Sequence, residues 1–143
     1  MSNAKFKEYK GLNLTQLSQE VLEKWDREDT FRQSVLQREG SPAFIFYEGP
    51  PSANGMPGIH HMMARTIKDI ICRYKTGQGY KVNRKAGWDT HGLPVELGVE
   101  KKLGITKDEI GSKISIEEYN RTCREAVMEY TDVWGDLTRK MGY

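Results

Sequence analysis

The sequence predicts an α/β fold: a partial Rossmann-type parallel sheet, with a helical hairpin before it and a long helix after it. An apolar, aromatic run at 43–47 has the composition of a strand that is buried on both faces. The next segment, 48–58, is dense in Gly, Pro and Asn, which neither helices nor central strands accept. A helical apolar pattern over 61–76 and an extended piece at 80–86 complete the strand–helix–strand unit of a parallel sheet.

The first forty residues have the pattern of helices and form one predicted domain, an N-terminal extension at 1–40. Asn13 with Gln16 three residues later is typical of a helix N-cap. Apolar side chains follow at helical spacing, with a break near 26–30, and a second helix stops at Gly40. We expect a helical hairpin that packs against the sheet. The rest of the chain, 41–143, is predicted to be the first part of a Rossmann-type domain.

Helices account for most of the chain after the Gly/Pro segment. The helix predicted over 61–76 carries one continuous apolar stripe, and a further helix is predicted over 95–103. Two capping boxes follow: Thr106 with Glu109, and Ser115 with Glu118. The last apolar stripe runs over 116–141 and predicts a single long helix, in which Trp134 serves mainly for packing.

A strand, an irregular Gly/Pro loop and a helix N-terminus are the arrangement that holds a phosphate-bearing ligand above a parallel sheet. The loop backbone can approach the ligand closely, and the helix start offers unpaired N–H groups and a partial positive charge. A second polar segment, 87–94, follows the second extended piece. Because ligands lie beyond the carboxyl ends of parallel strands, we expect this segment to face the same crevice as the loop.

Composition sets outer bounds on the function. A chain of 143 residues can form one domain, but it is small for a complete enzyme that binds a phosphate-bearing ligand on a parallel sheet. Seven basic residues lie between positions 58 and 87 against one acidic residue, which suits an anionic ligand, although a solvated helix face explains the same pattern. Cys72 and Cys123 lie far apart and the chain has three histidines, so we expect no metal site and two reduced thiols in a cytoplasmic protein. No apolar run is long enough to span a membrane, and no membrane partner is expected.

Two motifs carry a resemblance to a known family. The first is 48–55 (Glu-Gly-Pro-Pro-Ser-Ala-Asn-Gly), and the second is 87–96 (Gly-Trp-Asp-Thr-His-Gly-Leu-Pro-Val-Glu). Together they resemble the start of the catalytic domain of isoleucyl-tRNA synthetases, which are class I aminoacyl-tRNA synthetases with a Rossmann-type core. The resemblance extends from about residue 12 to residue 143. The Thr-His-Gly at 90–92 favours the isoleucine branch over the leucine and valine siblings.

The resemblance departs from the family at the His-Ile-Gly-His signature that begins the first helix. Those four positions here read Gly58, Ile59, His60 and His61. The second signature histidine is retained as His61, the first is Gly58, and His60 replaces the usual glycine. His60 is therefore a candidate for the contact that is lost at position 58.

The resemblance implies two sets of site residues. The implied ATP-binding residues are Asn54, Gly55, Gly58, His60 and His61, of which His60 and His61 are the catalytic hydrogen-bond donors to the phosphates. The implied amino-acid-binding residues are Gly49, Pro50 and Asp89, with Asp89 holding the substrate ammonium. Without the family context each has a simpler interpretation: turn residues at 49–55, a surface pair of histidines, and an exposed N-cap or turn aspartate.

The function implied is isoleucine–tRNA ligase: activation of isoleucine by ATP with Mg, then transfer to the isoleucine tRNA. The family's Lys-Met-Ser-Lys-Ser signature is absent from the sequence, so an N-terminal fragment, inactive alone, is expected. A cut sheet edge would let the fragment self-associate. Two alternatives stay open: a non-catalytic nucleotide- or RNA-binding module derived from a class I synthetase domain, or a sibling synthetase for valine or leucine.

Overall fold

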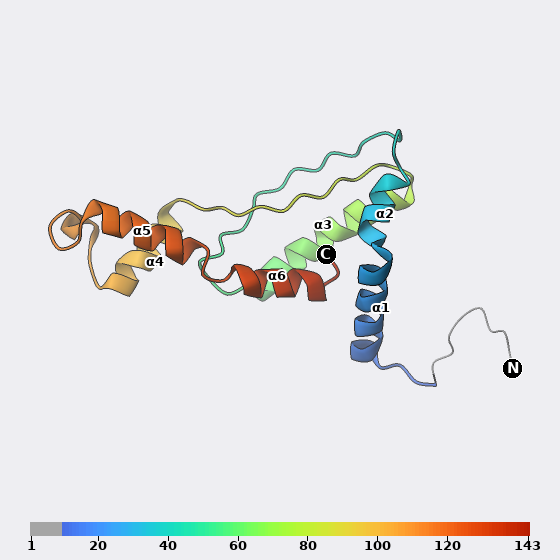
Figure 1. The fold of residues 1–143 in the computed structure, drawn as a ribbon, viewed down its shortest axis with the longest axis horizontal. Coiled ribbons are helices and arrows are strands. Elements are labelled where there is room, and N and C mark those ends of the chain that lie inside the picture. Colours follow the sequence, from blue (N-terminus) through green and yellow to red (C-terminus); the bar gives the residue numbers. More distant parts are fainter. Residues whose placement is uncertain (1–9) are drawn as a thin grey trace, which may run out of the picture.

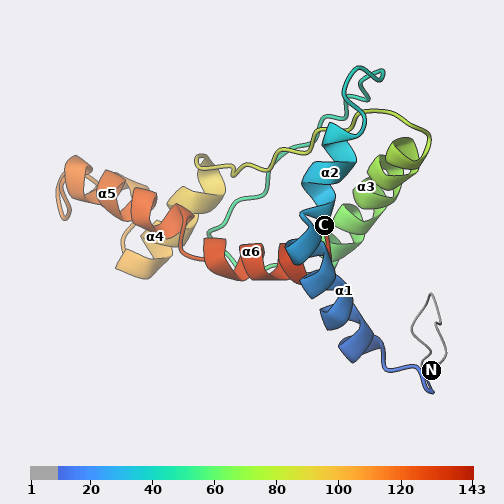
Figure 2. The ribbon, with the colours of Figure 1, turned by 45° about the vertical axis from the view of Figure 1, so that its right-hand side comes forward.

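The computed structural model describes residues 10–143, so the first nine residues of the predicted extension lie outside it. The molecule is elongated, with helices joined by long extended segments (Figure 1). The helices are α1 (Leu14–Glu28), α2 (Thr30–Leu36), α3 (Ile59–Gly77), α4 (Leu93–Leu103), α5 (Ile116–Val127) and α6 (Thr131–Lys140), with a short 3-10 helix at Lys107–Glu109. Helices α4 and α5 form one end of the molecule, α1 and α2 the other, and α6 lies between (Figures 1 and 2). No helix within 10–143 is long and apolar enough to cross a membrane.

The predicted parallel sheet is wrong, because residues 10–143 contain no strand. The two segments predicted as strands are extended and run side by side along the molecule (Figures 1 and 2). An isolated parallel bridge joins Ala43 to Lys81. There, the Phe44 N–H donates to the Lys81 carbonyl at 3.0 Å, and the Lys81 N–H donates to the Pro42 carbonyl at 3.0 Å. The strand–helix–strand order thus brings two extended segments together without forming a Rossmann-type sheet.

The missing burial explains why these segments do not become strands. A parallel sheet is stable when both of its faces are covered, and an isolated strand pair is marginal. Here Ile45 is 69% and Tyr47 is 90% exposed. The apolar stripe of α3, which would cover a sheet, is also exposed, at Ile59, Met63, Ile67, Ile70 and Tyr74. The chain therefore exposes an apolar row on α3 and not a cut sheet edge.

Helices α1 and α2 form a kinked rod, so the predicted helical hairpin is also wrong. The Asn13 side chain accepts a hydrogen bond from the Gln16 N–H at 3.1 Å, which confirms the predicted cap. Asp29, with a left-handed φ of 49°, is both the C-cap of α1 and the N-cap of α2. A single joining residue leaves no room for a reversal, and α2 continues in the direction of α1 (Figures 1 and 2).

The last apolar stripe is divided between two helices, so the prediction of one long C-terminal helix is wrong. The break lies at 128–130, between α5 and α6. The Tyr130 N–H leaves the helical ladder there and donates to the Ala53 carbonyl in the Gly/Pro loop at 3.0 Å. A tertiary contact therefore sets the break. The capping box of Thr106 with Glu109 is confirmed, and its Thr106 N–H donates to Glu109 at 2.9 Å. At Ser115 only the N-cap half of the predicted box is present: the Glu118 N–H donates to the Ser115 side chain at 3.1 Å.

Two small apolar clusters hold the fold together. The first lies where α4 packs on α5 and buries Val95, Val99, Tyr119 and Val127. The second surrounds Trp134 of α6, which is 1% exposed and contacts the rings of His61 and Trp88. Ala53, which is 0% exposed, is bonded through its carbonyl to Tyr130 just before α6. Because Ala53 belongs to the Gly/Pro loop, the second cluster fixes the position of the predicted ligand segment.

Candidate active site

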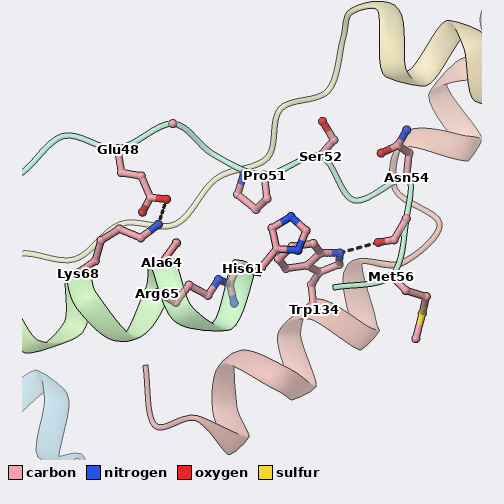
Figure 3. A pocket seen from close by; sticks show the side chains of 12 residues that line it. Glu48, Pro51, Ser52, Asn54, Met56, His61, Ala64, Arg65, Lys68 and Trp134 are labelled. Atoms are coloured by element: carbon pink, nitrogen blue, oxygen red, sulfur yellow. Dashed lines mark hydrogen bonds and ion pairs between the residues drawn. The ribbon is translucent and has the colours of Figure 1, made fainter. Parts of the chain in front are cut away.

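A pocket of about 350 Å³ lies between the Gly/Pro loop, the first turns of α3 and helix α6 (Figure 3). The loop contributes residues between Glu48 and Met56. The helices contribute His61, Ala64, Arg65 and Lys68 from α3, and Trp134 from α6. The predicted arrangement of a loop against a helix N-terminus is thus present, with a third wall from α6 that the sequence did not indicate.

Helix α6 holds the loop in place through Trp134. The indole N–H donates to the Gly55 carbonyl at 2.8 Å (Figure 3). Together with the bond from Tyr130 to Ala53, this gives the loop two fixed backbone points. Sequence reasoning assigned Trp134 to packing and missed this bond. An apolar helical stripe does not reveal which loop carbonyl its indole will meet.

Two hydrogen bonds bring the second motif to the loop. The Asp89 N–H donates to the Pro51 carbonyl at 2.9 Å, and the Asn54 side-chain amide donates to the Pro94 carbonyl at 3.1 Å. These bonds attach 87–94 to the loop, as expected, but no residue of 87–94 lines the pocket. The adjacency persists without a sheet, because both extended segments run side by side from the α2 end of the molecule toward α4 (Figure 1).

His61 is positioned by the backbone that precedes it. The Gly58 N–H donates to Nδ1 of His61 at 2.9 Å, so in the neutral ring Nε2 carries the proton and can donate. The imidazole meets the indole of Trp134 edge-on, with ring centroids 4.7 Å apart (Figure 3). Burial lowers the pKa of His61, and the positive charges of His60 and Arg65 lower it further. A neutral, oriented hydrogen-bond donor results.

Two cations follow His61 along the same face of α3. The guanidinium of Arg65 lies 4.9 Å from the centroid of the Trp134 ring and 5.4 Å from that of Tyr143, and it bonds to the Thr138 hydroxyl. The ammonium of Lys68 pairs with Glu48 across the pocket (Figure 3). Burial lowers the pKa of both Arg65 and Lys68.

These two cations were missed as individual site residues. The basic stretch at 58–87 was the available signal, and helical spacing from His61 is what selects Arg65 and Lys68 from it. Glu48 offsets the charge of Lys68, so Arg65 and the N-terminus of α3 are the groups that give the pocket the chemistry of a site for an anion.

Asp89 lies beside the loop and outside the pocket lining. Its carboxylate accepts a long hydrogen bond, 3.4 Å, from the His91 N–H, and the His91 imidazole lies 3.7 Å away. The Asp89 side chain is 42% exposed. Among residues 10–143 Asp89 has no Lys or Arg partner, so its carboxylate is available to a small cation.

The other predicted site residues fall into two groups. Gly49, Asn54, Gly55 and His61 line the pocket. Pro50, Gly58 and His60 do not line it, although Gly58 and His60 contact His61 at its rim. Within residues 10–143 no three His, Cys, Asp or Glu side chains gather as a metal site would require. Cys72 and Cys123 are free thiols.

The sequence profile of a family described as tRNA synthetases class I (I, L, M and V) matches residues 20–143. The chain belongs to this family. Over 139 residues, this synthetase chain is 65% identical to the isoleucine–tRNA ligase of Bacteroides fragilis, an alignment that covers 97% of the chain and 12% of that protein. It is 64% identical over 139 residues to the isoleucine–tRNA ligase of Bacteroides thetaiotaomicron, with the same coverage.

A more distant relative is isoleucine–tRNA ligase 2 of Bacillus anthracis, 51% identical over 123 residues that make up 86% of the chain and 12% of that protein. The resemblance to isoleucyl-tRNA synthetases that the two motifs carry is confirmed by these relatives. The synthetase chain spans about 12% of the length of the curated relatives that it matches.

Proposed function

We propose that this chain supplies the amino-acid activation site of an isoleucine–tRNA ligase. The hydrogen bond from the Asp89 N–H to the Pro51 carbonyl, 2.9 Å, carries the proposal. It fastens the acidic second motif to the loop that leads to His61. The Asp89 carboxylate and the pocket that holds His61 and Arg65 are thus attached to the same loop. An amino acid that reacts with a polyphosphate presents an ammonium and an anion, the two charges that these groups complement.

The proposed reaction has two steps. A carboxylate oxygen of isoleucine attacks the α-phosphorus of ATP, which enters as its magnesium complex, and the bond to the bridging oxygen breaks to release pyrophosphate. A ribose hydroxyl at the end of the tRNA then attacks the acyl carbon, and AMP leaves. No covalent bond to the protein is required, so the chain contributes positioning and electrostatic stabilisation.

The ATP-side roles go to the loop and the start of α3. Asn54, Gly55 and Gly58 would line the nucleotide, and His60 and His61 would donate to the phosphates as negative charge develops. The Nε2 proton that the bond from Gly58 leaves on His61 supports this role. Arg65, which shares the pocket with His61, would add positive charge to the phosphate side, whereas Lys68 is paired with Glu48.

The amino-acid side consists of Asp89 with Gly49 and Pro50. Asp89 would bind the ammonium, since its carboxylate is half exposed and lies beside the loop. Gly49 and Pro50 would contribute backbone to the amino-acid pocket. The names of the relatives favour isoleucine over valine and leucine, and no observation favours a non-catalytic module.

The test is amino-acid-dependent exchange of pyrophosphate into ATP by the full-length protein, with isoleucine, valine and leucine supplied separately, followed by charging of isoleucine tRNA. We expect the highest kcat/KM with isoleucine. Preference for valine or leucine would assign the protein to a sibling enzyme. If the protein binds ATP but shows no pyrophosphate exchange with any of the three amino acids, the result would favour a non-catalytic nucleotide-binding module. The isolated chain, at about 12% of its relatives' length, is expected to show no exchange.

A further inference from the structure

The segment that leads into the Gly/Pro loop has a single polar attachment to the rest of the molecule. The backbone is hydrogen-bonded before this segment at Phe44 and after it at Pro51. Between these points, at 45–50, the polar contact found among residues 10–143 is the ion pair that Glu48 makes with Lys68 (Figure 3). The placement of the backbone next to Glu48 therefore depends on this pair.

Lys68 reaches Glu48 from the helix that carries the phosphate side of the site. It lies on α3 about two turns after His61, and both residues line the pocket. The Lys68 side chain is 15% exposed and that of Glu48 is 36% exposed, so water and salt screen the pair less than a fully exposed one. The neighbouring carboxylate, Asp69, is already paired with two arginines and does not compete for Lys68.

We propose that Glu48 is a positioning residue for the amino acid: its ion pair with Lys68 holds the backbone of Gly49 and Pro50 in a fixed place relative to α3. This inference rests on the proposed function, because it explains how the amino-acid side of that site is set against the phosphate side. Lys68 acts as the partner of Glu48 and not as a phosphate ligand. Without the pair, the segment would have to be ordered when the amino acid binds, and that ordering weakens binding.

Loss of the ion pair is expected to raise the KM for isoleucine in pyrophosphate exchange by the full-length protein. Glu48→Gln and Lys68→Met each remove one charge with little change of shape. Each should raise this KM by about tenfold, between the effects of exposed and of fully buried pairs, with little change in kcat. The double variant should show the same rise as either single variant, because all three lose one interaction. Lys68→Arg, which keeps the charge, should stay close to the wild type.

The KM for ATP separates this role from direct contact between Lys68 and the phosphates. The double variant Glu48→Gln/Lys68→Met leaves the net charge of the pocket as it is in the wild type. Its KM for ATP should therefore equal the wild-type value. If Lys68 contacts the phosphates, Glu48→Gln alone would lower the KM for ATP and the double variant would raise it.

Glu39→Gln is the matched control. Glu39 pairs with Lys81 at 2.8 Å, so it also attaches an extended segment through a lysine, but neither residue lines the pocket. This variant should keep the wild-type KM for isoleucine.

Three results would overturn the inference and leave the proposed function in place. They are an unchanged KM for isoleucine in Glu48→Gln, single losses that multiply in the double variant, and a raised KM for ATP in the double variant. A wild-type protein that shows no exchange with isoleucine would overturn the proposed function, and this inference with it.

Discussion

The indole N–H of Trp134 donates a hydrogen bond to the Gly55 carbonyl at 2.8 Å and joins α6 to a loop 79 residues earlier in the chain. The loop has no regular structure of its own, since its Gly and Pro residues do not build a ladder of hydrogen bonds. Its shape is imposed from outside by Trp134 and by the backbone bond from Tyr130 to Ala53. The pocket therefore depends on α6, which the motifs alone did not indicate.

Replacing Trp134 by Phe is expected to loosen the loop. The ring remains, but the Gly55 carbonyl loses its donor, which corresponds to a loss of about 1–3 kcal/mol in local stability. Hydrogen–deuterium exchange of the full-length protein should show faster exchange in a peptide covering 49–58, by roughly tenfold or more. Exchange in a peptide covering 93–103 should be unchanged, and equal protection of 49–58 in both proteins would contradict the role given to Trp134.

His61 is expected to make stability depend on pH just below neutrality. Its pKa in the folded protein is lowered from 6.5 by burial, with further lowering by His60 and Arg65. As the pH falls below 6.5, the unfolded chain takes up the proton before the folded chain does, so the folded state loses stability. Carboxylates titrate mostly at lower pH, which leaves this window to histidine.

The measurement is the melting temperature of the wild type and of His61→Gln between pH 7.5 and 5.5. At pH 7.5 the wild type should have the higher melting temperature of the two proteins. The difference in melting temperature between the wild type and His61→Gln should become smaller as the pH falls to 5.5. A melting-temperature difference that stays constant from pH 7.5 to 5.5 would show that His61 has the same pKa in the folded and the unfolded protein.

Tyr119 carries a buried hydroxyl between α4 and α5. The residue is 7% exposed, and among residues 10–143 its oxygen has no partner at normal hydrogen-bond geometry, with only a weak interaction with the Cys123 thiol. Burial raises the pKa of Tyr119 to about 12, with Cys123 adding to the effect. Tyr119→Phe should therefore raise the local stability of α4 and α5 by roughly 1 kcal/mol, whereas Tyr119→Ala should lower it by about 3–5 kcal/mol. Hydrogen–deuterium exchange checks this prediction: the amides of α4 and α5 should exchange more slowly in Tyr119→Phe than in the wild type. Faster exchange in Tyr119→Phe would show that the Tyr119 hydroxyl makes a stabilising hydrogen bond.

The isolated chain is expected to self-associate through the exposed apolar row of α3. Ile67 is 59% and Ile70 is 61% exposed, within a contiguous set of large apolar side chains. Sedimentation velocity should show concentration-dependent oligomers, and Ile67→Glu should reduce them. The neighbouring change Thr66→Glu, at an exposed polar position, is the control and should have little effect. A monomer at all concentrations would contradict this prediction.

Local interactions explain which parts of the fold could be predicted. The N-caps at Asn13 and Ser115 involve residues three positions apart, so the sequence shows both partners together. The prediction of a sheet was wrong because the apolar run at 43–47 indicates that these side chains favour burial, but does not show which element would cover them. The break before α6 was invisible for a related reason, since the partner of Tyr130 is Ala53, far away in the chain.

The candidate site likewise contains residues that the sequence indicated and residues that only the structure identified. The motifs identified the loop, His61 and Asp89, because these residue types are unusual at that spacing. Arg65 and Lys68 looked like any basic residues on a helix face until the fold turned them toward the loop. The pairing of Glu48 with Lys68 required coordinates, since the two residues belong to different segments of the chain.

The most direct test of the account is the KM for isoleucine in pyrophosphate exchange by full-length Asp89→Asn, which removes the charge and keeps the shape. We predict that this KM rises by about tenfold or more, the loss of one charged hydrogen bond, while the KM for ATP stays near the wild-type value. The exposed Asp108→Asn should leave both constants unchanged. An unchanged KM for isoleucine in Asp89→Asn would contradict the claim that the fold brings Asp89 to the loop to bind the amino acid.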